Sequence, residues 1–258
     1  MEHGANINEE TIYGWTPLYS ACNKGYENIV KYLVEHGANI NKEDKIGRTP
    51  LYSACNKGYK NIVKYLVEHG ANINKETIFG WTPFFIACQE GHITVVKYLV
   101  EHGADINKGN NNGTIPLYIA CQNGHKSVVK YLVEHGADIN KGNNDCWTPL
   151  YIASKEGYQG VVKYLVEHGA DINKKNNDGW TSLLISCQEG HEDVVKYLME
   201  HGAYINKKII NDYNLLFNAC QKGHIIIIKY LLAFFKDINK VKNKGETLLS
   251  NACKSGNE

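Results

Sequence analysis

The chain has 258 residues, of which 43% are hydrophobic and 21% charged, so it is too apolar for a disordered chain and is expected to fold. Its 28 basic and 27 acidic residues leave a formal net charge of +1, which gives no overall attraction to nucleic acid or to an anionic membrane. The longest apolar stretch, Ile225 to Phe235, is far shorter than the roughly 20 residues that span a bilayer. The first residues show no secretion signal, so a cytoplasmic, reducing location is expected.

The sequence repeats itself with a period of 33 residues. Residues 14–46 and 47–79 differ at only five positions, and the same register continues along the chain. A fixed period of this size indicates a solenoid, in which each unit buries its apolar face against its neighbours. Neither end carries a polar capping repeat, so we expect a segment of a longer array or of a multidomain protein. The predicted boundaries within one array are a tail of a preceding repeat (1–13), full repeats (14–46, 47–79, 80–112, 113–145, 146–178, 179–211 and 212–244) and the first helix of a truncated repeat (245–258).

Each repeat is predicted to form two short helices. In the first repeat Thr16 is a good N-cap, and Pro17 occupies the first helical position, where its missing N–H costs nothing. Gly25 can end this helix in the left-handed conformation, and a second helix should run from about Glu27 to Gly37. The predicted buried residues are Leu18, Ala21 and Cys22 on the first helix and Ile29, Val30, Leu33 and Val34 on the second.

Three segments of the first repeat carry a family resemblance: Gly14-Trp-Thr-Pro-Leu-Tyr-Ser-Ala-Cys, then Gly25, then Ile29-Val-Lys-Tyr-Leu-Val-Glu-His-Gly-Ala-Asn. They resemble the ankyrin repeat, whose period is also about 33 residues and whose signature is Thr-Pro-Leu-His-x-Ala. The resemblance implies an all-α solenoid of stacked helix-turn-helix repeats with projecting loops and a concave ligand-facing side. In place of the signature histidine this chain has Tyr19, Tyr52, Phe85, Tyr118, Tyr151, Leu184 and Phe217. Apolar packing is therefore expected where the family has histidine-mediated hydrogen bonds between repeats.

The cysteines indicate packing rather than chemistry. Equivalent sites in stacked helices lie about 8–10 Å apart, whereas a disulfide needs Cα atoms within about 7 Å, so buried free thiols are expected. Seven cysteines share one position of the repeat: Cys22, Cys55, Cys88, Cys121, Cys187, Cys220 and Cys253. The eighth, Cys146, stands where other repeats have a loop glycine and is predicted to be exposed and reactive.

The histidines also follow the repeat. The set in Glu-His-Gly-Ala, from His3 to His201, is expected to bond the last carbonyls of its helices, because a regular row does not converge on a metal ion. A catalytic group is needed once, so the second periodic set (His92, His125, His191 and His224) also predicts a scaffold role. Catalytic and nucleotide-binding motifs are missing from the sequence. We expect no enzyme, no cofactor and no metal site.

Function should lie in the residues that vary while the repeat stays fixed. In the family the resemblance points to, these are the loop tips and the exposed end of the first helix. Large aromatic side chains in loops usually mark a binding surface. The predicted partner-binding residues are Tyr13, Trp15, Lys24, Ile46, Arg48, Lys57, Phe79, Trp81, Trp147 and Trp180. Binding energy is expected to centre on Trp15, Arg48 and Trp81, with an acidic, apolar-anchored ligand. The alternative is that each tryptophan packs on the adjacent loop and stiffens the stack.

The favoured function is a non-catalytic protein–protein interaction module that binds a peptide or protein domain on its concave face as a monomer. The alternative is a structural scaffold or elastic spacer within a larger multidomain protein, which the near identity of the first two repeats favours. A nucleic-acid partner is not expected, because the basic patch of Lys24, Lys45, Arg48 and Lys57 is small, and a membrane is not expected either. The array should open first after about Asn206, where the repeat pattern weakens.

Overall fold

The computed structural model describes residues 6–204, 219 and 222–234, and in this part of the chain it contains helices and no strands. The helices are α1 (Pro17–Lys24), α2 (Glu27–Glu35), α3 (Pro50–Lys57), α4 (Lys60–Glu68), α5 (Pro83–Gln89), α6 (Ile93–Glu101), α7 (Pro116–Gln122), α8 (Lys126–Glu134), α9 (Pro149–Lys155), α10 (Gln159–Glu167), α11 (Ser182–Glu189), α12 (Glu192–Glu200) and α14 (Ile225–Phe234). The all-α class and the helix-pair repeat predicted from the sequence are confirmed.

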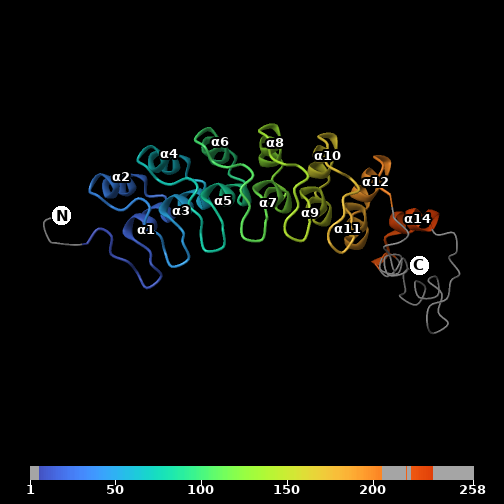
Figure 1. Cartoon of the computed structure of the whole chain (residues 1–258), viewed down its shortest axis with the longest axis horizontal. Helices are drawn as coiled ribbons and strands as arrows, with labels where there is room; N and C mark the ends of the chain where they lie inside the picture. The colour runs from blue at the N-terminus through green and yellow to red at the C-terminus, as the bar shows by residue number, and fades with distance from the viewer. Residues whose placement is uncertain (1–5, 205–218, 220–221, 235–258) are drawn as a thin grey trace. The chain divides into compact units, whose positions relative to one another are not determined.

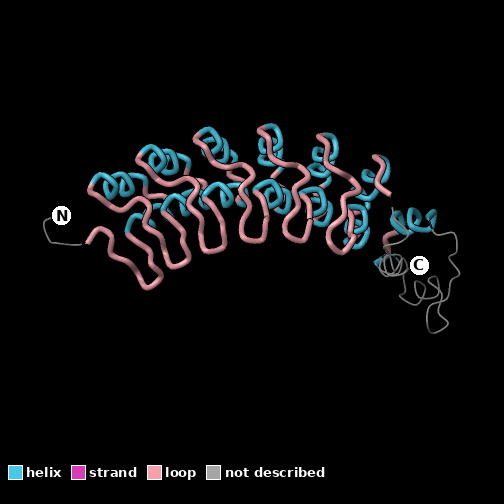
Figure 2. The backbone as a smooth tube through the Cα atoms, viewed as in Figure 1, coloured by secondary structure: helices cyan, strands magenta, loops and turns pink. Residues whose placement is uncertain are grey.

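The chain forms two compact units, Met1–Asp138 and Ile139–Glu258. In the first unit the inner helices α1, α3, α5 and α7 pack side by side, and the outer helices α2, α4, α6 and α8 form a second row (Figure 1). In the second unit α9 packs on α11, and α10 packs on α12 in the same manner. Within each unit the loops that join successive pairs project to one side (Figure 2). That the repeats form one array over the whole chain stays a prediction.

The helix ends follow the predicted residues. Thr16 Oγ1 accepts a hydrogen bond from the N–H of Tyr19 (3.1 Å), and Pro17 begins α1. Gly25 ends the helix with φ at +79°, a conformation that favours glycine. In the fourth pair Ile115 replaces the capping threonine, and its helix begins at Pro116 without a side-chain cap. The helix boundaries therefore come from local sequence signals that recur in most of the described repeats.

Histidines end the outer helices as predicted. Nδ1 of His36 donates to the carbonyl of Tyr32 (2.7 Å), and the two rings stack with centroids 4.0 Å apart. The same pair recurs at the end of the other outer helices from α4 to α12, where the histidines are His69, His102, His135, His168 and His201. No group of three or more metal-ligating side chains occurs among the described residues.

Three predicted core positions of α2 are not buried: Leu33 and Val34 are half-buried, and Ile29 is exposed. Ile29 was expected on the buried face of α2 but is 48% exposed. Its equivalents Ile62 and Val95 are buried, because α4 packs on α2 and α6 packs on α4. Val30 is fully buried as predicted. The burial of the Ile29 position thus depends on a preceding outer helix, and α2 is the first outer helix of the described chain.

The repeat cysteines are buried free thiols as far as the structure describes them. They are Cys22, Cys55, Cys88, Cys121 and Cys187. Burial raises the pKa of each of these thiols. Cys146 is exposed, as predicted, and its φ of +62° is the only positive φ of a residue other than glycine in the described chain. His3, Cys220, Cys253, Phe217 and the predicted truncated repeat 245–258 lie outside the described residues.

The residues that replace the signature histidine are buried, and a different set of histidines joins the repeats. Tyr19, Tyr52 and Phe85 are at most 6% exposed, in line with the predicted apolar packing, although the Tyr19 hydroxyl also forms a hydrogen bond with Ser53 of the next repeat. The second histidine set carries the hydrogen bonds between repeats, with Nε2 donating to a carbonyl 36 residues earlier. These bonds join His92 to Asn56 (3.2 Å), His125 to Gln89 (2.8 Å) and His191 to Lys155 (2.8 Å).

Asparagines form a second set of junctions between repeats. Nδ2 of Asn41 donates to the carbonyl of Gly70 (3.1 Å), and its Oδ1 accepts from the N–H of Asn72 (2.8 Å). Asn140 makes the same pair of bonds in the second unit, to Gly169 and Asp171. Every junction of this kind spans 29 residues for the donated bond and 31 residues for the accepted bond.

Candidate binding surface

Each projecting loop is closed by a polar side chain at its base. In the first loop Oγ1 of Thr11 accepts from the N–H of Trp15 (3.1 Å), and in the second Oδ1 of Asp44 accepts from the N–H of Arg48 (2.8 Å). The residue at the base also donates its own N–H to the carbonyl of the fourth residue after it, as Thr11 does to Trp15 (3.0 Å). This arrangement forms a tight turn and leaves the two residues after the base at the tip. In the second loop the N–H of the second tip residue, Ile46, also donates to Oδ1 of Asp44 (3.0 Å), so the backbone of the tip takes part in the turn and its side chains are left free of it.

Neighbouring loops of the first unit are tied to one another. Backbone hydrogen bonds run from Lys45 N to Tyr13 O (3.3 Å), from Ile78 N to Ile46 O (3.0 Å) and from Asn111 N to Phe79 O (3.1 Å). Ion pairs link the same loops closer to the helices, between Lys42 and Glu10 (2.7 Å), Lys75 and Glu43 (2.7 Å), and Lys108 and Glu76 (2.9 Å). The tips are therefore fixed relative to one another before any partner binds.

Large apolar side chains stand at the tips of the first three loops. Ile12 is 76% exposed, Tyr13 62%, Ile78 59% and Phe79 46%, and Ile46 between them is half-buried. We call these five residues the apolar tip row. The sequence analysis named Tyr13, Ile46 and Phe79 but missed Ile12 and Ile78. Their position next to an aromatic residue in the same two-residue tip is the signal that could have identified them.

The tryptophans lie below the tips. Trp15 is half-buried, and its ring stacks on Tyr19 with centroids 5.4 Å apart. Its indole Nε1 is buried, with no hydrogen-bond partner in the described chain. Trp81 is half-buried as well, with Phe79 tilted against it at 5.1 Å. These contacts place the Trp15 indole between Tyr13 of the tip row and α1, and the Trp81 indole beside Phe79 of the tip row. The role of both as partner anchors stays a prediction.

Arg48 is held by an acid of its own loop. Its Nε and Nη2 each lie 2.7 Å from Oδ2 of Asp44, whose side chain is buried. The guanidinium lies 5.8 Å from the ring centroid of Tyr19. The charge of Arg48 is therefore largely balanced within the protein, and the residue contributes more to the shape of the second loop than to its charge.

The inner helices form the rest of this face. Tyr52 is buried on α3, and burial raises its pKa to about 12, with Arg48 lowering it and Glu90 raising it. α3 packs between α1 and α5, so the ends of these three helices lie side by side. The exposed residues at this end of the inner helices are Lys24, Lys57 and Glu90, at equivalent positions of three successive repeats.

The second unit has the same geometry with polar tips. Trp147 is half-buried and stacks on Tyr151 with centroids 5.5 Å apart, and Lys155 Nζ lies 5.9 Å from the Trp147 ring centroid. Trp180 is half-buried at the equivalent position of the next repeat. The tips here hold Asn144, Asp145, Asn177 and Asp178, all exposed. The predicted tryptophans therefore recur, but the apolar tips do not.

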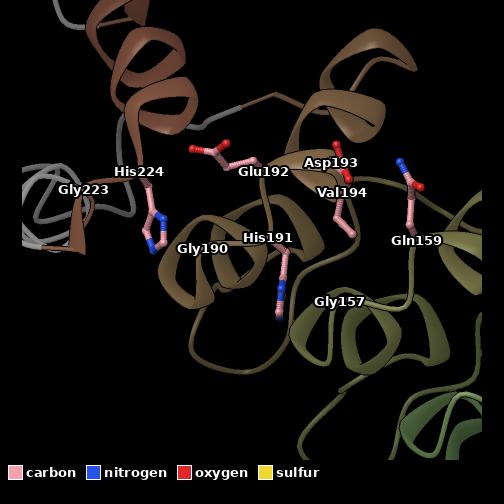
Figure 3. A pocket seen from close by; sticks show the side chains of 9 residues that line it. All are labelled: Gly157, Gln159, Gly190, His191, Glu192, Asp193, Val194, Gly223 and His224. Atoms are coloured by element: carbon pink, nitrogen blue, oxygen red, sulfur yellow. The ribbon is translucent and has the colours of Figure 1, made fainter.

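A separate hollow of about 520 Å³ lies in the second unit along the starts of α10, α12 and α14 (Figure 3). His191 points toward Gly157 and His224 toward Gly190 (Figure 3). The polar groups in the hollow are mostly used by the repeat, since His191 bonds a carbonyl of α9 and Glu192 accepts from the N–H of Ile226 (3.2 Å). No pair of nucleophile and base is assembled in this hollow.

The architecture defines a class of protein. Its short helices form two rows and recur every 33 residues, and its variable side chains lie on the face that bears the loops. These features define a helical repeat protein. Models of ankyrin repeats in three copies match residues 1–77, 74–143 and 140–209, and models of ankyrin repeats in many copies match residues 187–232 and 216–258. The chain therefore belongs to the ankyrin-repeat family.

Ankyrin repeats are generally protein–protein interaction modules, and proteins that contain them are generally non-catalytic. No curated protein matches this chain at a significant level. Among the described helices, none combines the length and the apolar character that crossing a bilayer requires.

Proposed function

We propose that this protein binds a protein or peptide partner through the apolar tip row and the adjoining inner helices of its first unit. The observation that carries the proposal is the exposure of Ile12, Tyr13, Ile78 and Phe79 on loops that hydrogen bonds hold together. In this proposal the protein acts without catalysis, as a monomer in the cytoplasm, and its ligand is neither nucleic acid nor a membrane.

The physical argument rests on rigidity and exposed apolar area. Apolar side chains that remain in water gain free energy when a partner covers them, by roughly 25 cal/mol per Å². The backbone bonds between loops hold the tips in place, so little ordering entropy is lost on binding. The tryptophans beneath the tips provide a firm base for such contacts, and Trp15, Trp81 and Arg48 contribute to binding mainly by supporting the tips.

The differences between the two most similar repeats support recognition over a spacer role. Of the five positions at which residues 14–46 and 47–79 differ, four lie in the loops: Trp15/Arg48, Asp44/Thr77, Lys45/Ile78 and Ile46/Phe79. The fifth, Glu27/Lys60, begins the outer helix. A spacer has no need for differences that are concentrated in the loops while the rest of the repeat is almost unchanged. A scaffold role remains the second candidate, because Trp15 and Trp147 stack on their own inner helices.

The test compares two double variants with equally exposed targets. Tyr13→Ser/Phe79→Ser removes the rings from the tip row, and Tyr26→Ser/Tyr204→Ser removes two aromatic rings of similar exposure away from it. Proteins retained from a cell lysate by the unmodified chain should be lost with the tip variant and kept with the control. Circular dichroism should be the same for all three. Retention that is unchanged by the tip variant would contradict the proposal and favour the scaffold role.

A further inference from the structure

We infer that the partner segment is an extended acidic peptide, with apolar side chains on the apolar tip row and acidic side chains over Lys24 and Lys57. This inference rests on the proposed function and names the chemistry of its ligand. It depends on which cations of the first unit are balanced within the protein and which are not.

Most cations near the first three loops are paired. Lys42, Lys75 and Lys108 bond Glu10, Glu43 and Glu76, and Arg48 bonds Asp44. Lys24, Lys45 and Lys57 are exposed, and none of them takes part in an ion pair with another described residue. Unbalanced positive charge therefore remains at the ends of α1 and α3 and at the second loop tip.

The spacing of these lysines suits an extended chain. Lys24 and Lys57 end adjacent inner helices, whose axes lie about 8–10 Å apart. Side chains on one face of an extended strand recur about every 7 Å. The long, flexible lysine side chain can bridge the remaining difference. Acidic residues two or three positions apart in a partner could thus pair with both lysines.

The favourable charge ends at the third repeat. The position equivalent to Lys24 and Lys57 holds the exposed Glu90 there, directly after α5, which packs beside α3. In the second unit the equivalent residue is Glu156, which is also exposed. An acidic segment is therefore attracted to the first two inner helices and repelled from the position of the third.

A polypeptide fits this surface better than a nucleic acid. Nucleic-acid binding needs a track of many cations to replace the counterions of successive phosphates. Here the unpaired cations are few, and the tip row includes Ile12 and Ile78, which have no ring on which a base could stack. A segment that carries both apolar and acidic side chains matches both features.

Peptide selection on the full chain tests the inference. Random peptides of about 12 residues are long enough to span three repeats when extended. Selection by display at low salt should enrich Asp and Glu together with Leu, Ile, Phe or Trp. The affinity of the best peptide is then measured by fluorescence anisotropy for the unmodified chain and for each variant.

Three variants separate the possible outcomes. Lys24→Glu/Lys57→Glu should weaken the selected peptide about tenfold or more, and Glu90→Lys should strengthen it about threefold. The matched control Lys60→Glu/Lys126→Glu makes the same charge change at the exposed starts of two outer helices and should alter affinity less than about twofold. Equal binding by Lys24→Glu/Lys57→Glu and the unmodified chain would overturn the inference.

The remaining outcomes distinguish this inference from the proposed function. Selected peptides that lack acidic residues but still need the tips, judged with Tyr13→Ser/Phe79→Ser, would overturn the acidic ligand and keep the binding surface. A selected peptide that binds the tip variant at full strength would overturn the surface itself. Failure to select any peptide would overturn the peptide ligand alone, since a folded domain could still bind. Tighter binding of a short oligouridine, dependent on Lys24 and Lys57, would replace the peptide with nucleic acid.

Discussion

The first three loops and the next three are built by the same turn, yet they present opposite chemistry. Thr11, Asp44 and Thr77 close the first three, and Asn110, Asn143 and Asn176 close the others with the same bond to the N–H four residues on. The first set carries isoleucine, tyrosine and phenylalanine at its tips, and the second carries only Asn and Asp. The turn thus depends on the base residue, and the tip is left open to change.

The exposed ends of the inner helices differ in the same way. Lys24 and Lys57 are followed at the equivalent position by Glu90 in the third repeat and Glu156 in the fifth. Beneath them the core is almost unchanged, since Leu18, Leu51 and Leu150 are all buried. The comparison teaches that stability and recognition are carried by different residues of each repeat, which mutations can separate.

The largest expected effect is the difference in labelling rate between the exposed Cys146 and the buried repeat cysteines of both regions. Brief iodoacetamide treatment of the native chain should modify Cys146 about a thousandfold faster than Cys88 or Cys187. Burial shields the two repeat thiols, and it raises the pKa of Cys187 to about 12, so little thiolate forms near neutral pH. Mass mapping of the labelled peptides measures the rates. In strong denaturant the difference should disappear, and fast native labelling of Cys88 would contradict the prediction.

The second prediction tests whether the scaffold is equally strong under apolar and polar loops. Leu51→Ala in α3 and Leu150→Ala in α9 each remove a buried side chain and leave a cavity, so each should lower the free energy of unfolding by about 2–5 kcal/mol. Urea denaturation followed by circular dichroism measures both. A loss below about 1 kcal/mol for either variant would show that the two regions do not share one scaffold.

The third prediction converts an apolar tip into a polar one. Ile78→Asn/Phe79→Asn gives the third loop the tip sequence of the fourth, Asn111-Asn112. Partner or peptide binding should fall about thirtyfold or more, because the loss of one binding hot spot costs about 2 kcal/mol. The free energy of unfolding should change by less than about 0.5 kcal/mol, since both side chains are exposed. A large loss of stability with unchanged binding would show that these tips serve packing.

The smallest expected effect is at the fifth loop. Cys146 adopts a φ of +62° where Gly47, Gly80 and Gly113 adopt similar values, and a side chain in this region costs about 1 kcal/mol. Cys146→Gly should therefore raise the free energy of unfolding by up to about 1 kcal/mol, as measured in urea. The control Gly80→Ala should have the opposite sign, because its Cβ would meet Asn111. Lower stability of Cys146→Gly would mean that the thiol makes a contact of its own.

The sequence predicted the repeat, the helix ends and the buried thiols, because these follow from the residue pattern within one repeat. Thr16, Pro17 and Gly25 are local signals, and the structure places the helix boundaries at them. Ile29 was predicted wrongly, since the burial of this position depends on an outer helix in the preceding repeat. The bonds of His92 and its equivalents were missed for the same reason, although Gly58 gives a clue: the ring of His92 occupies the space that a Cβ there would need.

The candidate surface was predicted in part. The sequence located the variable positions, but it took aromatic and basic residues as anchors without knowing their exposure. Trp15 is half-buried on Tyr19, and Arg48 is paired with Asp44 four residues earlier in the same loop. That spacing of opposite charges is visible in the sequence and could have indicated the pair. How far each tip side chain extends into solvent could not be predicted, because it depends on the turn formed at the base of the loop.

The asparagine junctions make whole repeats interchangeable. Each one joins its asparagine to a carbonyl 29 residues later and to an N–H 31 residues later, whichever repeat supplies them. If residues 47–79 were deleted, Asn41 would meet the carbonyl of Gly103 and the N–H of Asp105 in place of Gly70 and Asn72. The backbone bond between loops would be restored as well, with Asn111 N donating to Ile46 O. A gene encoding this chain could therefore gain or lose a 33-residue unit by recombination without breaking a junction, and each event would lengthen, shorten or reorder the binding surface.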